Sequence, residues 1–159
     1  MSVAFTKESD HEAFAADLPD RPVSSHPNLV TAEGLAAIEQ ALAEARTAYG
    51  AARSDGEIQA DRTAMARATR DLRYWSARRS TAQLTRRDPE KPGAQFGDRV
   101  TVEREDGRRQ TFRIVGEDEA DPKQGSISWV SPLAQGLLGR EVGEAVMVAG
   151  AEVELTSID

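Results

Sequence analysis

The stretch TAEGLAAIEQALAEARTAYGAARSDG, residues 31–56, predicts a helix that ends in a turn. Thr31 offers a hydroxyl group at the N-cap, and Glu33 places an acid in the first turn, where the helix dipole favours negative charge. Apolar residues follow at steps of three and four, the spacing of a coiled-coil seam. They are Leu35, Ile38, Leu42, Ala45, Tyr49 and Ala52. Asp55-Gly56 then signals a turn.

A second helix is predicted from about Glu57 to Leu84. Its heptad positions are Ile58, Met65, Leu72 and Arg79, with Ala68, Trp75 and Ala82 between them. Two helices joined by a short turn form an antiparallel hairpin, so we expect one over residues 31–84. The arginines expected on its outer faces are Arg62, Arg67, Arg70, Arg73 and Arg78.

After a linker at residues 85–95, apolar and polar residues alternate, which is typical of half-buried strands. The expected strands are DRVTVER (98–104), RRQTFRIV (108–115), GSISWV (125–130), EAVMVAG (144–150) and AEVELTSI (151–158). EDGR at 105–108 predicts a hairpin turn. SPLAQGLLG at 131–139 predicts a short helix capped by Ser131. The predicted fold class is therefore α+β: an N-terminal antiparallel helical coiled-coil hairpin, then a β-rich C-terminal domain at 96–159.

Residues 1–30 are rich in Pro, Ser, Asp and Ala. Three prolines disfavour helix there, so we expect an extended, weakly ordered arm with room for a short helix at residues 8–17. The first residues, MSVAFTKESDHEAF, carry acids and lack the apolar stretch of a secretory signal. No apolar run is long enough for a transmembrane helix.

Composition excludes several functions. The chain has no cysteine, which rules out disulfides and thiolate metal sites and suits a reducing cytoplasm. Both histidines lie in the N-terminal arm, and no nucleophile–base pair, P-loop or dinucleotide motif is present, which argues against an autonomous enzyme. The net charge of −7 argues against wholesale wrapping of nucleic acid. Charge is uneven, with eight arginines against seven acids in 31–84 but thirteen acids against seven bases in 96–159.

Two groups of charged residues on the hairpin are candidate functional residues. Asp55, Glu57 and Asp61 sit at or just after the turn, and carboxylates grouped there could hold Mg²⁺, which can activate water for phosphodiester cleavage. Ordinary turn and helix-dipole chemistry explains the same acids equally simply. The arginines of the second helix could track an RNA backbone, or could form a solvated coiled-coil face.

Two further features of the second half have plain structural explanations. The acidic loop GEDEADPKQG at 116–125 lacks EF-hand spacing and is expected to be a solvated connector between strands. Trp129 alternates with Ile127, so we expect it in the core or at an interface.

The stretch IVGEDEADPKQGSISWVSPLAQGLLGREVGEAV, residues 114–146, closely resembles the C-terminal domain of the bacterial Gre-type (GreA/GreB) transcription elongation and transcript-cleavage factors. The TAEG sequence at 31–34 is similar to the start of the hairpin in that family. The resemblance spans about 31–158. It implies an FKBP-like C-terminal domain behind the coiled coil, in a cytoplasmic protein that we expect to be monomeric.

The resemblance also implies a partner and a mechanism. The C-terminal domain would dock on bacterial RNA polymerase, at the rim of the secondary channel, through Val130, Ser131, Pro132 and Leu133. The coiled coil would enter the channel, where tip acids help hold the polymerase's second catalytic Mg²⁺. The polymerase itself would then hydrolyse backtracked RNA, so the chain would be an accessory factor, meeting nascent RNA indirectly and holding no cofactor when free. On this chain the acids would be Asp55 and Glu57, with Asp61 in support, and the RNA-facing arginines Arg62, Arg67 and Arg70.

The hairpin departs from the family pattern in two ways. The family tip reads Gly-Asp, two residues, then Glu-Asn, and by alignment the two key acids fall on Gly56 and Gln59, so Asp55 and Glu57 are displaced neighbours. The hairpin is also shorter by roughly four to five residues per arm, about 7 Å at ~1.5 Å per residue. Three hypotheses follow: a cleavage-stimulating Gre-like factor, a Gre-related regulator that occupies the channel without cleavage and would inhibit synthesis, or a generic helical-hairpin adaptor.

Overall fold

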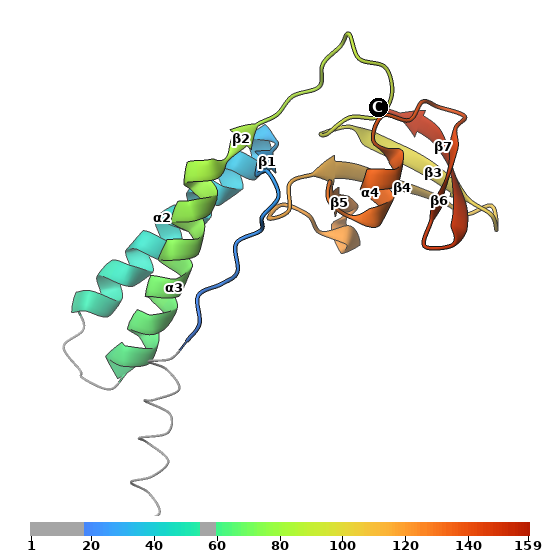
Figure 1. The fold of residues 1–159 in the computed structure, drawn as a ribbon. Helices are drawn as coiled ribbons and strands as arrows, with labels where there is room; N and C mark the ends of the chain where they lie inside the picture. The colour runs from blue at the N-terminus through green and yellow to red at the C-terminus, as the bar shows by residue number, and fades with distance from the viewer. Residues whose placement is uncertain (1–17, 55–59) are drawn as a thin grey trace, which may run out of the picture. The chain divides into compact units, whose positions relative to one another are not determined.

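The computed structural model describes residues 18–54 and 60–159, which form a helical hairpin and a β-rich domain (Figure 1). The predicted α+β fold class is therefore confirmed. No helix within these residues is long and apolar enough to cross a membrane.

The chain divides into two compact units whose bounds differ from the predicted ranges. Residues 18–25 and Ala37–Thr81 form the hairpin unit, while His26–Ala36 groups with Ala82–Asp159 in the β-rich unit. The β-rich unit therefore includes the start of the first helix and the residues just before it.

The hairpin helices are α2, Ala32–Ser54, and α3, Ala60–Thr81. The predicted seam of α2 is confirmed, since Ile38, Leu42, Ala45 and Ala52 are buried. On α3, Ala68 is buried and its neighbours along the seam are half-buried. Ile58, which was expected on the same seam, lies outside the described residues.

Helix α2 begins as the sequence predicts. The Thr31 hydroxyl accepts a hydrogen bond from the backbone N–H of Gly34 at 2.9 Å, and the Thr31 carbonyl accepts one from the Leu35 N–H at 2.9 Å. Thr31 thus satisfies amide groups that would lack partners at a helix start.

The last turns of α3 contradict the predicted register. Arg78, expected on an outer face, is only 2% exposed, whereas Arg79, expected on the seam, is exposed and pairs with Glu39 at 3.0 Å. A straight helix turns every 3.6 residues, so its inward face drifts from a strict seven-residue repeat. Here the drift turns Arg78 inward after Trp75, and the buried guanidinium is not left without a partner, as a buried charge requires.

Two short strands replace the predicted end of the second helix and part of the arm. Helix α3 ends at Thr81, and β2, Gln83–Leu84, pairs in parallel with β1, Leu29–Val30. Asn28 and Val30 are buried. Of the expected extended arm, Leu29–Val30 form a strand, and residues 18–28 contain no helix or strand. The helix expected at residues 8–17 lies outside the described residues.

A five-stranded sheet in the order β5-β4-β3-β7-β6 forms the β-rich unit. Its strands are β3, Arg99–Arg104; β4, Arg109–Val115; β5, Ser126–Ser128; β6, Ala145–Val148; and β7, Ala151–Ile158. Neighbours pair antiparallel except β4 and β5, which are parallel and joined by the 3₁₀ helix η1, Pro122–Gln124. The predicted strand at 125–130 is thus shorter, because Trp129 and Val130 already belong to the following turn.

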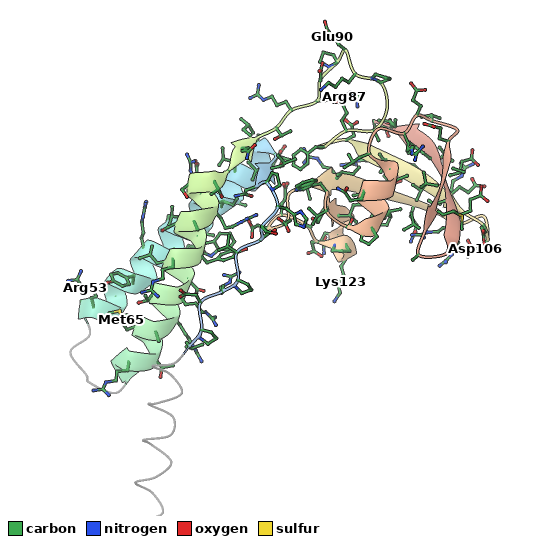
Figure 2. The ribbon with its side chains drawn as sticks, viewed as in Figure 1. Arg53, Met65, Arg87, Glu90, Asp106 and Lys123 are labelled. Carbon is green, nitrogen blue, oxygen red and sulfur yellow. The ribbon has the colours of Figure 1, made fainter. Side chains whose placement is uncertain are left out.

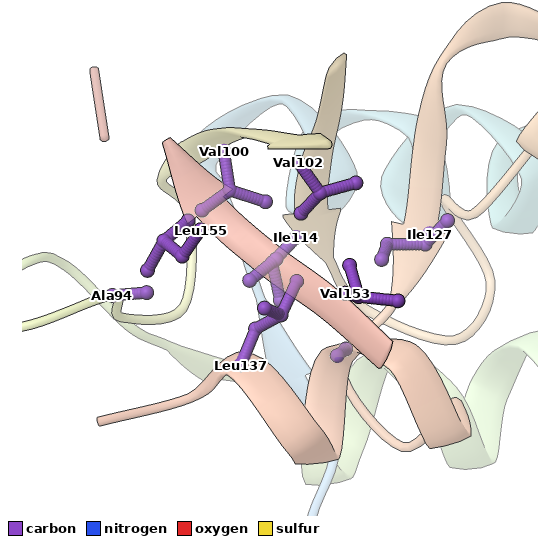
Figure 3. Close-up of a cluster of buried hydrophobic side chains, with 9 residues drawn as sticks. Ala94, Val100, Val102, Ile114, Ile127, Leu137, Val153 and Leu155 are labelled. Carbon is purple, nitrogen blue, oxygen red and sulfur yellow. The ribbon is translucent and has the colours of Figure 1, made fainter. Parts of the chain in front are cut away.

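The core lies between the sheet and helix α4, Pro132–Leu137 (Figure 3). Its buried residues are Ala94, Val100, Val102, Ile114, Ile127, Ala134, Leu137, Val153 and Leu155. They alternate along the strands as predicted, so one face of the sheet is buried. Helix α4, which follows β5 in the chain, packs against this face.

The first part of the acidic loop after β4 fastens the start of α2 to the sheet, whereas residues 121–124 are exposed, as expected of a solvated connector. The Thr31 hydroxyl donates to Oε2 of Glu119 at 2.6 Å, and Arg113 on β4 donates to Glu33 at 3.3 Å. Gly116 is needed at this junction, because a Cβ there would lie 2.4 Å from the Leu29 carbonyl oxygen. The contacts of this loop with residues 29–33 could not be predicted, because the two segments are distant in sequence.

Candidate functional site

The corner between β5 and α4 has a backbone fixed by hydrogen bonds. The Ser131 N–H donates to the Ser128 carbonyl at 3.0 Å, and the Val130 N–H donates to the Ser128 hydroxyl at 3.2 Å. The Ser131 hydroxyl caps α4 by accepting from the Ala134 N–H at 3.4 Å, as predicted. The Gln135 side chain closes the turn by donating to the Trp129 carbonyl at 2.6 Å.

The four residues predicted to dock differ in what they expose. Pro132, at the first turn of α4, is exposed. Val130 and Ser131 are half-buried, and Leu133 is half-buried against the core. The corner therefore presents a small surface centred on Pro132. Leu133 packs against the core and holds this surface in place.

Trp129 connects this corner to the segment before α2. Its ring packs against the core and meets the His26 ring edge-on, with 6.0 Å between centroids. Its Nε1–H is buried without a hydrogen-bond partner in the described part of the chain. Sequence reasoning placed Trp129 in the core or at an interface but missed His26, because no local pattern joins residues 103 positions apart.

The three arginines predicted to meet RNA are not equally available. Arg62 and Arg67 are exposed on α3, whereas Arg70 is half-buried and lies 3.9 Å from the Asp71 carboxylate. At about 100° per residue, the three span about 140° of the helix circumference. Arg70 lies between the other two on this arc, so its partial burial beside Asp71, and not its direction, makes it less accessible to an RNA backbone.

The segment at residues 18–25 covers part of α3, which the sequence did not predict. The Arg21 guanidinium lies 3.8 Å from the centre of the Tyr74 ring and 3.6 Å from the Asp71 carboxylate. Asp20 pairs with Arg73 at 3.2 Å. These contacts occupy Arg73, whereas Arg62 and Arg67 near the start of α3 are exposed. The residues next to Arg21, Asp20 and Pro22, form no sequence pattern from which its contact with the Tyr74 ring could have been predicted.

The tip acids fall largely outside the described residues. Asp55 and Glu57 lie in the undescribed turn, and Asp61 is described only as backbone of α3. Figure 2 labels Arg53 and Met65, which flank that turn on α2 and α3. Within residues 18–54 and 60–159, no three His, Cys, Asp or Glu side chains come together as a metal site. The Mg²⁺ role of the tip therefore stays a prediction.

The family model and the sequence relatives that match this chain point to the same family. The family model described as "Transcription elongation factor, GreA/GreB, C-term" matches residues 90–158. The transcription elongation factor GreA of Alkalilimnicola ehrlichii is 40% identical over 116 residues, which cover 70% of this chain and 72% of that protein. The transcription elongation factor GreB of Neisseria meningitidis serogroup B is 43% identical over 68 residues, 40% of this chain and 42% of that one.

Among solved structures, the GreA factor homolog 1 (Gfh1) protein of Thermus thermophilus is 20% identical, with a TM-score of 0.40 over 84% of this chain and 99% of that one. The family assignment rests on the sequence relatives.

Proposed function

Because this chain belongs to the GreA/GreB family of transcription elongation factors, we propose that it binds bacterial RNA polymerase at the rim of the secondary channel. It acts there as a cytoplasmic, monomeric accessory factor, without a membrane and without a cofactor of its own. The observation that carries this proposal is the rigid corner at Val130, Ser131, Pro132 and Leu133, which lies within the matched residues 90–158.

The corner suits docking because little order is lost on binding. Its backbone is already fixed by the hydrogen bonds around Ser128 and Ser131 and by the cap of α4. A preorganised surface loses less conformational entropy when a partner covers it than a mobile loop does. Exposed Pro132, with no N–H that needs a partner, can be covered without an unsatisfied donor.

We further propose that the hairpin tip acts on RNA through the polymerase's own active site. Asp55 and Glu57, with Asp61 in support, would supply carboxylate oxygens to the polymerase-bound Mg²⁺, which prefers such ligands. That ion, when bound, would help activate water for cleavage of backtracked RNA. Arg62 and Arg67, and less readily Arg70, would contact the RNA backbone.

A second candidate is a regulator that occupies the channel without cleavage. It is favoured by the displacement of the tip acids and by the length of the hairpin. Helix α2 has 23 residues and therefore extends about 34 Å at ~1.5 Å per residue. Since Mg–O bonds are ~2.1 Å, a tip that stops several Å short supplies no ligand. The same docking corner serves both candidates.

A stalled, backtracked elongation complex separates the two. If the tip acids share Mg²⁺, wild-type protein will shorten the RNA, and Asp55→Ala with Glu57→Ala will abolish this while polymerase binding persists. Losing a metal ligand removes several kcal/mol of charge stabilisation, and each ~1.4 kcal/mol is about tenfold in rate. Glu44→Ala, an exposed acid within α2, is the matched control and should cleave as wild type does.

The outcomes are distinct. A wild type that slows nucleotide addition without shortening the RNA, across a Mg²⁺ titration, identifies the regulator. A wild type that neither shortens RNA nor slows synthesis contradicts both candidates and leaves the adaptor.

A further inference from the structure

A cleft in the β-rich unit gathers arginines from separate segments. It has a volume of about 210 Å³ and lies between the start of α2, the linker after β2, residues 96–98 just before β3, and strand β4. Its lining includes Arg86 and Arg87 from the linker, Arg113 from β4, and the carboxylates of Glu33 and Asp98. The three guanidinium groups and two carboxylates leave the lining with a net positive charge.

Two of these arginines are held in place and keep free donors. Arg87, labelled in Figure 2, pairs with the buried carboxylate of Asp98 and donates to the Gly93 carbonyl at 3.4 Å. Arg113 donates through Nε to the Gly97 carbonyl at 3.3 Å and through Nη2 to Glu33 at 3.3 Å. A guanidinium carries five N–H groups, so each still has donors to offer a ligand.

The third arginine has no partner. Arg86 is exposed, and its side chain makes no hydrogen bond or ion pair within the part of the chain that the structure describes. It lines the cleft together with Arg87 and Arg113, whose charges are already met by Asp98 and Glu33. The charge of Arg86 is the one in this lining that no carboxylate of the described residues offsets, so a bound anion would be attracted to it.

The Glu33 carboxylate lies in the lining of the cleft and accepts a hydrogen bond from Arg113. Its own backbone N–H first, and then the Arg113 guanidinium, hold the pKa of the Glu33 carboxyl below its usual value. The surroundings of that carboxylate therefore favour negative charge. The side chain is 67% exposed, so it can move aside and release Arg113 to a stronger anion.

We propose that this cleft binds a phosphate group. The planar fork of arginine matches two oxygens of phosphate at once, and several forks can share one tetrahedral group. The volume lies below the roughly 300–1,000 Å³ of pockets for drug-sized ligands, so it suits one phosphoryl group and not a whole nucleotide. The phosphate comes either from a small molecule, such as a nucleoside diphosphate, or from an RNA backbone. The inference does not depend on polymerase binding.

Titration of the full chain with inorganic phosphate at low ionic strength, followed by NMR, tests the proposal. The amide signals of Ala32 and Gly97 and the Nε–H of Arg113 should shift and saturate together. Arg86→Ala and Arg113→Gln should each weaken binding by roughly tenfold, the loss expected for a charge-assisted hydrogen bond. Glu33→Gln should strengthen binding, because it removes the competing carboxylate, and a damaged fold cannot produce that gain.

Arg109→Gln is the matched control. Arg109 lies on β4 with Arg113 but pairs with Glu103 at 2.8 Å and does not line the cleft. It should leave the phosphate affinity unchanged. Shifts that do not saturate, a Glu33→Gln variant that binds no better, or equal losses in Arg109→Gln and Arg113→Gln would overturn the proposal.

Two further titrations distinguish the sources of phosphate. A nucleoside diphosphate and a short single-stranded RNA are added to wild type and to Arg86→Ala. Tighter binding of the diphosphate, lost in the variant, supports a small-molecule ligand, and tighter binding of the RNA, lost likewise, supports a backbone phosphate. If neither depends on Arg86, the proposal fails.

Discussion

Gly116 and Gly50 occupy opposite environments, although neither has a positive φ. A Cβ on Gly116 would meet the Leu29 carbonyl oxygen at 2.4 Å, a backbone atom that cannot move without disturbing β1. A Cβ on Gly50 would meet nothing within 4 Å, and the residue lies in the interior of α2. The same substitution should therefore have opposite effects at the two sites.

We expect Gly116→Ala to lower the free energy of unfolding by about 1–3 kcal/mol, the usual range for overpacking. Gly50→Ala should raise it by about 0.5–1 kcal/mol, since glycine costs that much within a helix. Urea denaturation of both variants beside wild type measures the two changes. If Gly116→Ala leaves the free energy of unfolding unchanged, β1 and the loop after β4 do not pack as closely as the structure shows.

Glu33 links the start of α2 to the sheet through charge. Because the folded pKa is lowered, its stabilising effect is present above the ordinary glutamate pKa and is lost as pH falls through the folded value. Arg113→Gln should raise the Glu33 pKa toward its ordinary value, as carboxyl NMR titration would show. Asp106, whose pKa is lowered chiefly by the Arg108 backbone N–H, should titrate unchanged in that variant. An unmoved Glu33 pKa would mean that Arg113 does not act on it.

At the scale of single elements, long periodic segments were predictable and short paired ones were not. The seam of α2 and the cap at Ser131 follow from local spacing and capping chemistry, which the sequence displays directly. The two-residue strands β1 and β2 have no periodicity of their own and exist only because residues 29–30 and 83–84 meet. The inward turn of Arg78 likewise depends on how α3 packs, which a strict heptad does not capture.

Helix α3 should meet RNA through its first half. Arg62→Ala with Arg67→Ala should weaken affinity for a backtracked elongation complex and make the salt dependence shallower by about one unit per lost phosphate contact. Arg70→Ala is the comparison, because Arg70 is half-buried beside Asp71 and should change binding little. Salt titration of complex affinity measures both. A double variant with the wild-type salt slope would show that these arginines do not contact phosphate.

Across the whole molecule, the order of hairpin and β-rich domain could be predicted from the change of period at the linker. The proposed docking corner at residues 130–133 is inferred from the resemblance around residues 114–146, and the cap of α4 beside it could be predicted from the Ser-Pro pair. What could not be predicted is the grouping of His26–Ala36 with the β-rich unit and the contact of His26 with Trp129. Both depend on residues far apart in sequence, which no local pattern joins.

The central claim is that this chain binds RNA polymerase through the corner at Pro132. The most direct measurement is the affinity of the full chain for bacterial core polymerase, for wild type, Pro132→Arg and Pro122→Arg. Pro122 is also an exposed proline at the start of a capped turn, on η1, and serves as the matched control. We predict that wild type and Pro122→Arg bind at micromolar concentrations or below, while Pro132→Arg binds at least about tenfold more weakly and melts normally; tenfold is ~1.4 kcal/mol. Absence of wild-type binding at micromolar concentrations, or equal affinity of Pro132→Arg and wild type, would contradict the claim.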